Sequence, residues 1–234
     1  MGQGLGLMLA VWLVANFVPH GLIYLFTGKV YLQFSPYAGF AGEISTMLLN
    51  LLLPLLALRY LSPARSTSLR DALAWRWRGW STLGWGVLGY ALGMAAALAI
   101  NVGLGPPFSY GAGIQPASRL ELVLLLLILV VLIAVTTLGE ETMFRGYLQT
   151  ELTERYGAWV GILLPALLFG LRHLPSDLYY GQGASPAMWL SRLSQLYLGA
   201  VVFGLTRHAA RSTASTWIMH LLTYLTAIFL GRGQ

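Results

Sequence analysis

Long apolar stretches separated by short polar turns constrain this chain more than any other feature. Seven of them stand out, at residues 5–26, 40–61, 80–103, 119–150, 158–174, 188–206 and 213–230. A helix needs about 20 residues to cross the hydrocarbon core of a bilayer. Only 9% of the residues are charged, whereas soluble domains carry about 25%. The sequence therefore predicts an all-α fold, a polytopic membrane bundle of about seven transmembrane helices.

The net charge and the cysteine content exclude several classes of function. The formal net charge is +6, but the arginines gather at the ends of the apolar stretches, which indicates membrane topology rather than nucleic-acid binding. There is no cysteine, which excludes disulfide and thiolate chemistry. The first stretch, 5–26, lacks a basic leader and is long enough to span, so we expect a membrane helix rather than a cleaved signal. The expected surroundings are the lipid bilayer, with no nucleic-acid partner.

A basic, aromatic segment lies near 59–80. Its arginines alternate with tryptophans, which is typical of an amphipathic segment at the membrane surface; a platform for an anionic substrate is the alternative. The residues concerned are Arg59, Arg65, Arg70, Arg76, Arg78, Trp75, Trp77 and Trp80. Placing this segment in the cytoplasm also places the amino terminus there. The 13 arginines against one lysine favour a prokaryotic inner or plasma membrane.

We divide the chain into residues 1–118, which hold generic membrane helices, and 119–234, which hold the polar motifs. Two loops rich in glycine and proline, 104–118 and 175–187, are expected on the outer side. Asp177, in the second loop, is interpreted as a solvated residue. Five tryptophans mostly lie near predicted helix ends and are expected in the aromatic belt at the membrane surface: Trp12, Trp85, Trp159, Trp189 and Trp217.

Two adjacent carboxylates, Glu140 and Glu141, follow the apolar run 122–135. A charged residue at the centre of a membrane helix costs roughly 2.5–3.5 kcal/mol, so it needs a partner or a task. Glu141 and Arg145 are spaced i, i+4 and can form an ion pair on one helix face. Glu140 points about 100° away, so we expect it to face the bundle interior.

Two histidines, His173 and His220, lie within other apolar stretches. The turn between the fourth and fifth stretches falls near Gly157, 17 residues after Glu140 and 16 before His173. An antiparallel helix pair would therefore place Glu140 and His173 at the same depth, about 25 Å from the turn. His220 lies nearer the inner side and needs a tilted helix or a re-entrant cavity to reach them. His20 and His208 are interpreted as structural or interfacial residues.

These residues resemble the motifs of the CPBP family, the CAAX-type (type II prenyl) intramembrane endopeptidases and their bacteriocin-processing relatives. Three motifs carry the resemblance: Glu140-Glu141-x-x-x-Arg145, then Phe169-x-x-x-His173, and a late intramembrane His220. The resemblance covers about residues 120–230. Where the family typically has an asparagine four residues after the last histidine, this chain has Tyr224, with Thr223 as a second hydroxyl.

The resemblance implies a membrane-embedded endopeptidase acting on membrane-associated, peptide or prenylated protein substrates. It implies that Glu140 and His173 activate a water, that His220 and Tyr224 stabilise the oxyanion, and that Glu141 and Arg145 hold the motif helix. Glu140, His173 and His220 would also suit a divalent metal such as zinc, so the sequence leaves a metal-free and a metal-dependent reaction open. Two alternatives remain: a non-enzymatic immunity or scaffold protein, and a proton-coupled transporter, for which no inverted repeat is visible.

Overall fold

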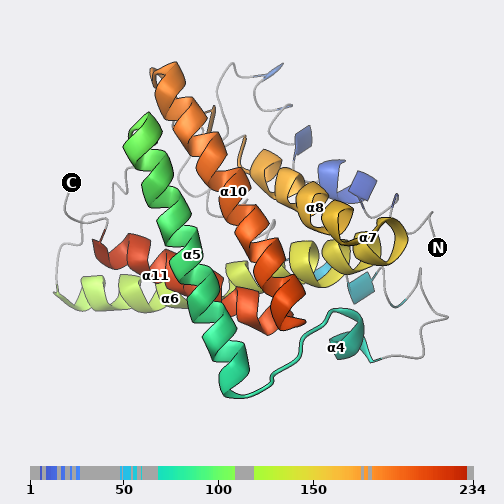
Figure 1. Ribbon diagram of the computed structural model, residues 1–234. Coiled ribbons are helices and arrows are strands. Elements are labelled where there is room, and N and C mark those ends of the chain that lie inside the picture. The colour runs from blue at the N-terminus through green and yellow to red at the C-terminus, as the bar shows by residue number, and fades with distance from the viewer. Residues whose placement is uncertain are drawn as a thin grey trace.

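Helices form the whole described fold (Figure 1). The computed structural model describes residues 68–108, 119–174, 177–178 and 181–230, with 6, 9–14, 17–18, 22, 25–26, 48, 50–53, 55–56 and 59. The helices are α4 (Leu69–Ala72), α5 (Trp80–Leu104), α6 (Arg119–Glu141), the π-helix η2 (Thr142–Leu148), α7 (Gln149–Tyr156), α8 (Ala158–Arg172), α10 (Pro186–Ala210) and α11 (Thr213–Leu230). No strand occurs among these residues, so the all-α prediction is confirmed.

The last five predicted stretches coincide with helices. The third, fifth, sixth and seventh stretches correspond to α5, α8, α10 and α11, and the fourth is extended through η2 and α7 as far as Tyr156. Residues 5–26 and 40–61 are helical where they are described, but most of them, His20 included, lie outside the described residues. Among the described helices, α5 alone is long and apolar enough to cross a bilayer. The count of seven transmembrane helices therefore remains a prediction.

Helices α5, α10 and α11 pack closely at the centre of the bundle. Helix α10 lies beside α5 and α8, and α11 packs against both α5 and α6 (Figure 1). A small residue allows this close approach: a Cβ added at Gly86 of α5 would lie 2.8 Å from Cγ2 of Ile218 and 2.9 Å from the Ser215 carbonyl oxygen. Small residues at helix interfaces are a usual means of bringing membrane helices together.

The basic segment before α5 is docked into the bundle rather than simply resting on its surface. Only four of its residues form helix α4, and Leu73 and Ala74 after it are buried. The backbone N–H of Thr213 donates to the Ala74 carbonyl at 2.8 Å, and its hydroxyl donates to the Leu73 carbonyl at 2.8 Å. Trp77, Arg78 and Trp80 are exposed, so the interfacial interpretation suits the part of the segment directly before α5. The segment is docked because its backbone carbonyls accept hydrogen bonds from Thr213 at the start of α11. A sequence pattern of side chains does not reveal such backbone bonds.

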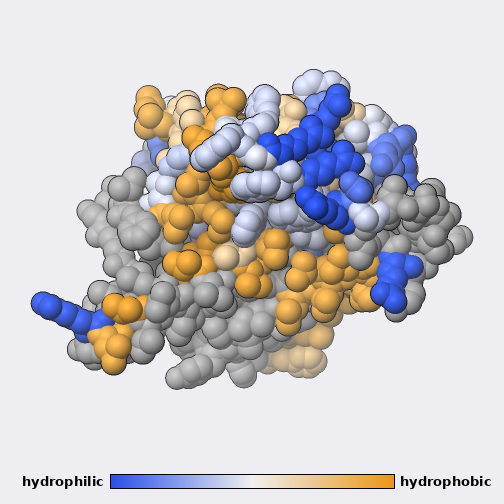
Figure 2. Space-filling view, turned by 90° about the horizontal axis from the view of Figure 1, so that it is seen from below, coloured by the Kyte–Doolittle hydropathy of each residue, from blue (hydrophilic) through white to orange (hydrophobic). Residues whose placement is uncertain are grey.

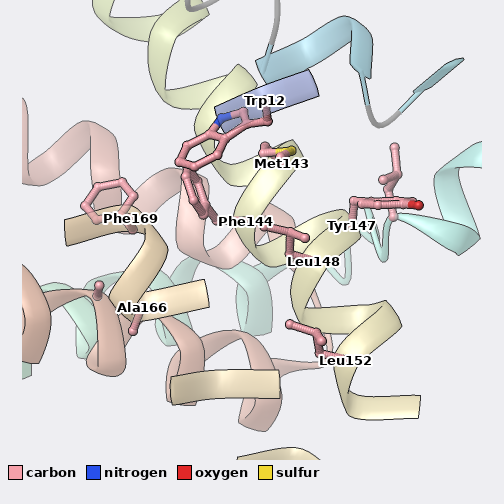
Figure 3. Close-up of a cluster of buried hydrophobic side chains, with 10 residues drawn as sticks. Trp12, Met143, Phe144, Tyr147, Leu148, Leu152, Ala166 and Phe169 are labelled. Atoms are coloured by element: carbon pink, nitrogen blue, oxygen red, sulfur yellow. The ribbon is translucent and has the colours of Figure 1, made fainter. Parts of the chain in front are cut away.

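An aromatic and aliphatic core surrounds η2 (Figure 3). Trp12 is fully buried, packs edge-to-face on Phe144 at 5.6 Å, and donates its indole N–H to Asn50 at 2.9 Å. The expectation of an interfacial Trp12 is therefore wrong. A buried indole needs an acceptor for its N–H, and Asn50 supplies one from a distant part of the chain.

Polarity is distributed opposite to the pattern of a soluble protein. Many large apolar side chains on α5, α8 and α10 are exposed, among them Val102, Leu167 and Leu190. Carboxylates, guanidinium groups and hydroxyls from α6, η2 and α11 are buried instead. Figure 2 shows hydrophobic side chains over much of one face, with hydrophilic ones gathered on part of it. An apolar exterior around a polar interior suits a protein surrounded by lipid.

Candidate functional site

The Glu-Glu-x-x-x-Arg motif lies at the junction of α6 and η2. Thr142 and Thr150, at the start of η2 and just beyond it, donate their hydroxyls to the carbonyls of Leu138 and Gly146 at 2.7 and 2.6 Å. These bonds satisfy carbonyls where the backbone leaves α-helical geometry. A Cβ at Gly146 would lie 3.1 Å from the Leu73 carbonyl oxygen, so glycine permits the basic segment to dock here. π-Helical turns occur frequently at functional sites.

Glu141 and Arg145 form the ion pair expected from their spacing. Their Oε1 and Nη1 atoms lie 3.2 Å apart, and both side chains are buried. Arg145 Nη2 also donates to the Ala200 carbonyl at 3.3 Å. Its guanidinium carbon lies 4.7 Å from the ring centroid of Phe169 and 4.8 Å from that of Phe203. Cation–π contacts and the carboxylate together compensate the burial of this charge.

His220 of α11 lies between the two carboxylates. Its Nδ1 is 2.8 Å from Glu141 Oε1, and its Nε2 is 3.5 Å from Glu140 Oε2. Because an ionised carboxylate only accepts, the short contact places a proton on Nδ1. Nε2 then accepts a proton in the neutral ring and donates one in the imidazolium. The packing of α11 against α6 brings His220 to the carboxylates, so no separate cavity is needed.

Glu140 faces the interior, as predicted, and meets a partner that the sequence did not identify. The Glu140 side chain is 1% exposed and its Oε1 is paired with Arg172 Nη1. Its Oε2 is buried and, among the described residues, accepts no hydrogen bond. The one sequence signal for Arg172 was its place inside an apolar helix, directly before His173. The two carboxylate oxygens of Glu140 are therefore chemically distinct.

His173 ends α8 and joins the site through an aromatic ring. Its Nδ1 lies 2.9 Å from the Phe169 carbonyl, and its ring lies 4.9 Å from that of Phe169, which is 6.0 Å from His220. The contacts of Glu140 described above are to Arg172 and His220, and the ring of Phe169 contacts both His173 and His220. The pairing of Glu140 with the neighbouring residue Arg172 agrees with the expected depth.

The loop after His173 holds a second buried pair. The Asp177 backbone N–H donates to the His173 carbonyl at 2.8 Å, and Arg192 lies 3.1 Å from Asp177 Oδ1. Asp177 is fully buried, so its interpretation as a solvated residue is wrong. Burial raises the pKa of Asp177, while Arg192 opposes that rise. The ion pair and the backbone hydrogen bond hold Asp177 close to the end of α8.

Tyr224 contacts His220 through its ring. The two rings are stacked, with centroids 5.3 Å apart and planes inclined by 22°. Thr223, the second hydroxyl considered from the sequence, donates to the Met219 carbonyl of its own helix at 3.0 Å. Of the two, Tyr224 is therefore the residue that touches the histidine.

Each of the two carboxylates is paired with an arginine, and this arrangement does not suit the binding of a metal ion. Among the described residues, no group of three or more His, Asp or Glu is arranged to hold an ion. Guanidinium groups of Arg172 and Arg145 occupy one oxygen each of Glu140 and Glu141. A divalent ion bound by Glu140, His173 and His220 would have to compete with these charges.

The fold and site define a helical protein with an apolar exterior and a buried acid–histidine centre. Residues 122–226 match the model of the family described as type II CAAX prenyl endopeptidase Rce1-like. The matched region contains all the motif residues from Glu140 to Tyr224. No curated protein and no solved structure matched the chain.

Proposed function

We propose that this protein is an intramembrane endopeptidase in which a glutamate and histidines activate water to hydrolyse peptide bonds. The observation that carries the proposal is Glu140: a buried carboxylate with one oxygen anchored and the other unbonded, facing His220 Nε2 at 3.5 Å. The Rce1-like match supports protease activity of the CAAX type. Glu140 Oε2 is the proposed proton acceptor for the attacking water.

The remaining roles follow from the contacts. Glu140 takes a proton from water, and the resulting hydroxide attacks the scissile carbonyl carbon to form a tetrahedral oxyanion. When this intermediate collapses, the C–N bond breaks and the leaving amine takes the proton that Glu140 holds with the help of His173. His220, protonated and held at Nδ1 by Glu141, donates from Nε2 to the oxyanion. Tyr224 supports its ring by stacking, and Arg145 keeps Glu141 in place. Fixed donors in a dry site stabilise an oxyanion more than water does.

We infer a reaction that needs no metal, because guanidinium groups already engage both carboxylates. The proposed substrates are peptides or prenylated proteins that reach the site from the membrane. The second candidate is a non-enzymatic immunity or scaffold protein, which the presence of an arginine on each carboxylate favours, since paired charges also serve as structural staples.

The test uses purified protein in detergent with a panel of prenylated carboxy-terminal peptides and small membrane-protein substrates. We expect the wild type to cleave at least one, and Glu140→Gln to lower kcat by about 10³-fold or more, because the base is lost. The variant should also unfold at a lower temperature, since buried Arg172 loses its carboxylate partner, so kcat is compared at a temperature at which both proteins are folded. A chelator is expected to leave the wild-type rate unchanged. Full activity of Glu140→Gln would exclude the proposed base, and loss of activity on chelation would favour the metal-dependent reaction. Cleavage of no substrate would favour the scaffold.

A further inference from the structure

Arg172 occupies a position that none of the proposed catalytic roles explains. It lies in the last turn of α8, where the carbonyl end of the helix dipole favours a cation. Its side chain is only 8% exposed and its guanidinium meets the carboxylate of Glu140, 32 residues earlier in the chain. A buried arginine on the proposed base, rather than on a surface residue, suggests a part in the reaction.

We propose that Arg172 is a positioning residue that anchors Oε1 of Glu140 and thereby makes Oε2 the oxygen that accepts the proton from water. The inference rests on the proposed function. The terminal torsion of a glutamate is broad, so a carboxylate without an anchor would present either oxygen in many orientations. Arg172 restricts this rotation.

The contacts around Glu140 indicate that Arg172 orients the carboxylate and does not prevent it from accepting a proton. Arg172 pairs with Oε1, whereas Oε2 is buried, has no hydrogen-bond donor among the described residues, and faces His220 Nε2 at 3.5 Å. An arginine that blocked the base would be expected on the oxygen that faces the histidine. The unbonded oxygen lies instead where water and a histidine can share a proton.

Arg145, the second buried arginine of the centre, pairs with the second carboxylate, that of Glu141. Arg145 lies 3.2 Å from Glu141 and between two phenylalanine rings, so each acid has its own cation. Since Arg172 directly precedes His173, the end of α8 carries both the anchor of the base and a histidine that contacts the ring of Phe169. The carboxy-terminal end of α8 therefore positions both the Glu140 carboxylate, through Arg172, and the His173 side chain.

The experiment compares Arg172→Gln, Arg172→Lys and the control Arg155→Gln in the peptide-cleavage assay, with kcat and KM determined separately. Arg155 pairs at 2.9 Å with Glu151, whose side chain is 2% exposed, so the control removes an arginine from another buried carboxylate on α7. A displacement of about 1 Å in a catalytic group can cost 10²-fold, so we expect Arg172→Gln to lower kcat by about 10²-fold with KM almost unchanged. Arg172→Lys retains the charge and should recover part of kcat, whereas Arg155→Gln should keep kcat near the wild-type value.

The results separate the inference from the function on which it rests. An unchanged or higher kcat in Arg172→Gln overturns the anchor, and a higher one indicates a block. The anchor is also overturned if folded Arg172→Lys is no more active than Arg172→Gln, or if Arg155→Gln loses as much kcat. When Glu140→Gln is inactive and Arg172→Gln is fully active, only the anchor fails; when Glu140→Gln is active, the proposed function fails as well.

Discussion

Tyr224 stands four residues after His220, where the resemblance described from the sequence leads us to expect an asparagine, and its contact with His220 suggests how it acts. Its ring is stacked on His220 with centroids 5.3 Å apart. An asparagine would act by hydrogen bonding, whereas a stacked ring restricts the orientation of the imidazole. We therefore expect the ring, more than the hydroxyl, to support activity.

Tyr224→Phe should retain most of the cleavage rate, and Tyr224→Ala should lose about tenfold, since stacked aromatic pairs contribute about 0.5–1.5 kcal/mol. The measurement is kcat/KM for both variants. Tyr90→Phe serves as a control, because the Tyr90 hydroxyl bonds Thr226 on the same helix α11 at 2.6 Å, away from His220. Equal losses in Tyr224→Phe and Tyr224→Ala would assign the role to the hydroxyl instead.

Between elements, the site depends on how closely α11 approaches its neighbours. Helix α11 carries His220 and is fixed on one side by α5, through Gly86, and on the other by the docked segment through Thr213. Trp217 of α11 also donates its indole N–H to Thr137 of α6 at 3.1 Å. These contacts set the height of His220 relative to the carboxylates.

Gly86→Ala should destabilise the protein by about 1–3 kcal/mol, because the added methyl meets Ile218 and the Ser215 backbone in a packed interface. Gly84→Ala in the same helix provides the matched control, since a Cβ there has nothing within 4 Å. Thermal unfolding in detergent, followed by circular dichroism, compares the two. Equal stability of the two variants would mean that α5 and α11 are not closely packed.

For the whole molecule, an apolar exterior and the distribution of arginine predict one orientation in the membrane. The exposed Trp77 belongs to the basic segment, which we place in the cytoplasm, and the exposed Gln182 lies in the loop predicted on the outer side. Because the chain has no cysteine, single-cysteine variants report on one position each.

In intact cells, an impermeant maleimide should label Gln182→Cys, and it should label Trp77→Cys only after permeabilisation, because excess arginine is retained on the cytoplasmic side. The readout is the mass shift of the labelled protein. A cysteine replacing Ser185, also exposed and at the start of α10, should behave as Gln182→Cys does. The reverse pattern would invert the proposed topology.

Local spacing was sufficient for much of the fold and part of the site. Apolar length predicted the helices, and the i, i+4 rule predicted the Glu141–Arg145 pair, which persists even though the backbone becomes π-helical at Thr142. Three features were not predicted: the burial of Trp12, the pair of Asp177 with Arg192, and the pair of Glu140 with Arg172. Each feature depends on a partner at least 15 residues away in the chain. The periodicity of a sequence does not specify such partners.

The sequence by itself determined that ionisable residues stand inside apolar helices and that Glu140 must face the interior, because the cost of exposing charge to lipid acts on each residue separately. Only the tertiary structure decided which cation neutralises which carboxylate, which oxygen of Glu140 stays unbonded, and that His220 reaches both acids. Those choices depend on helix crossings and side-chain directions, and these arise only when α6, α8 and α11 pack together.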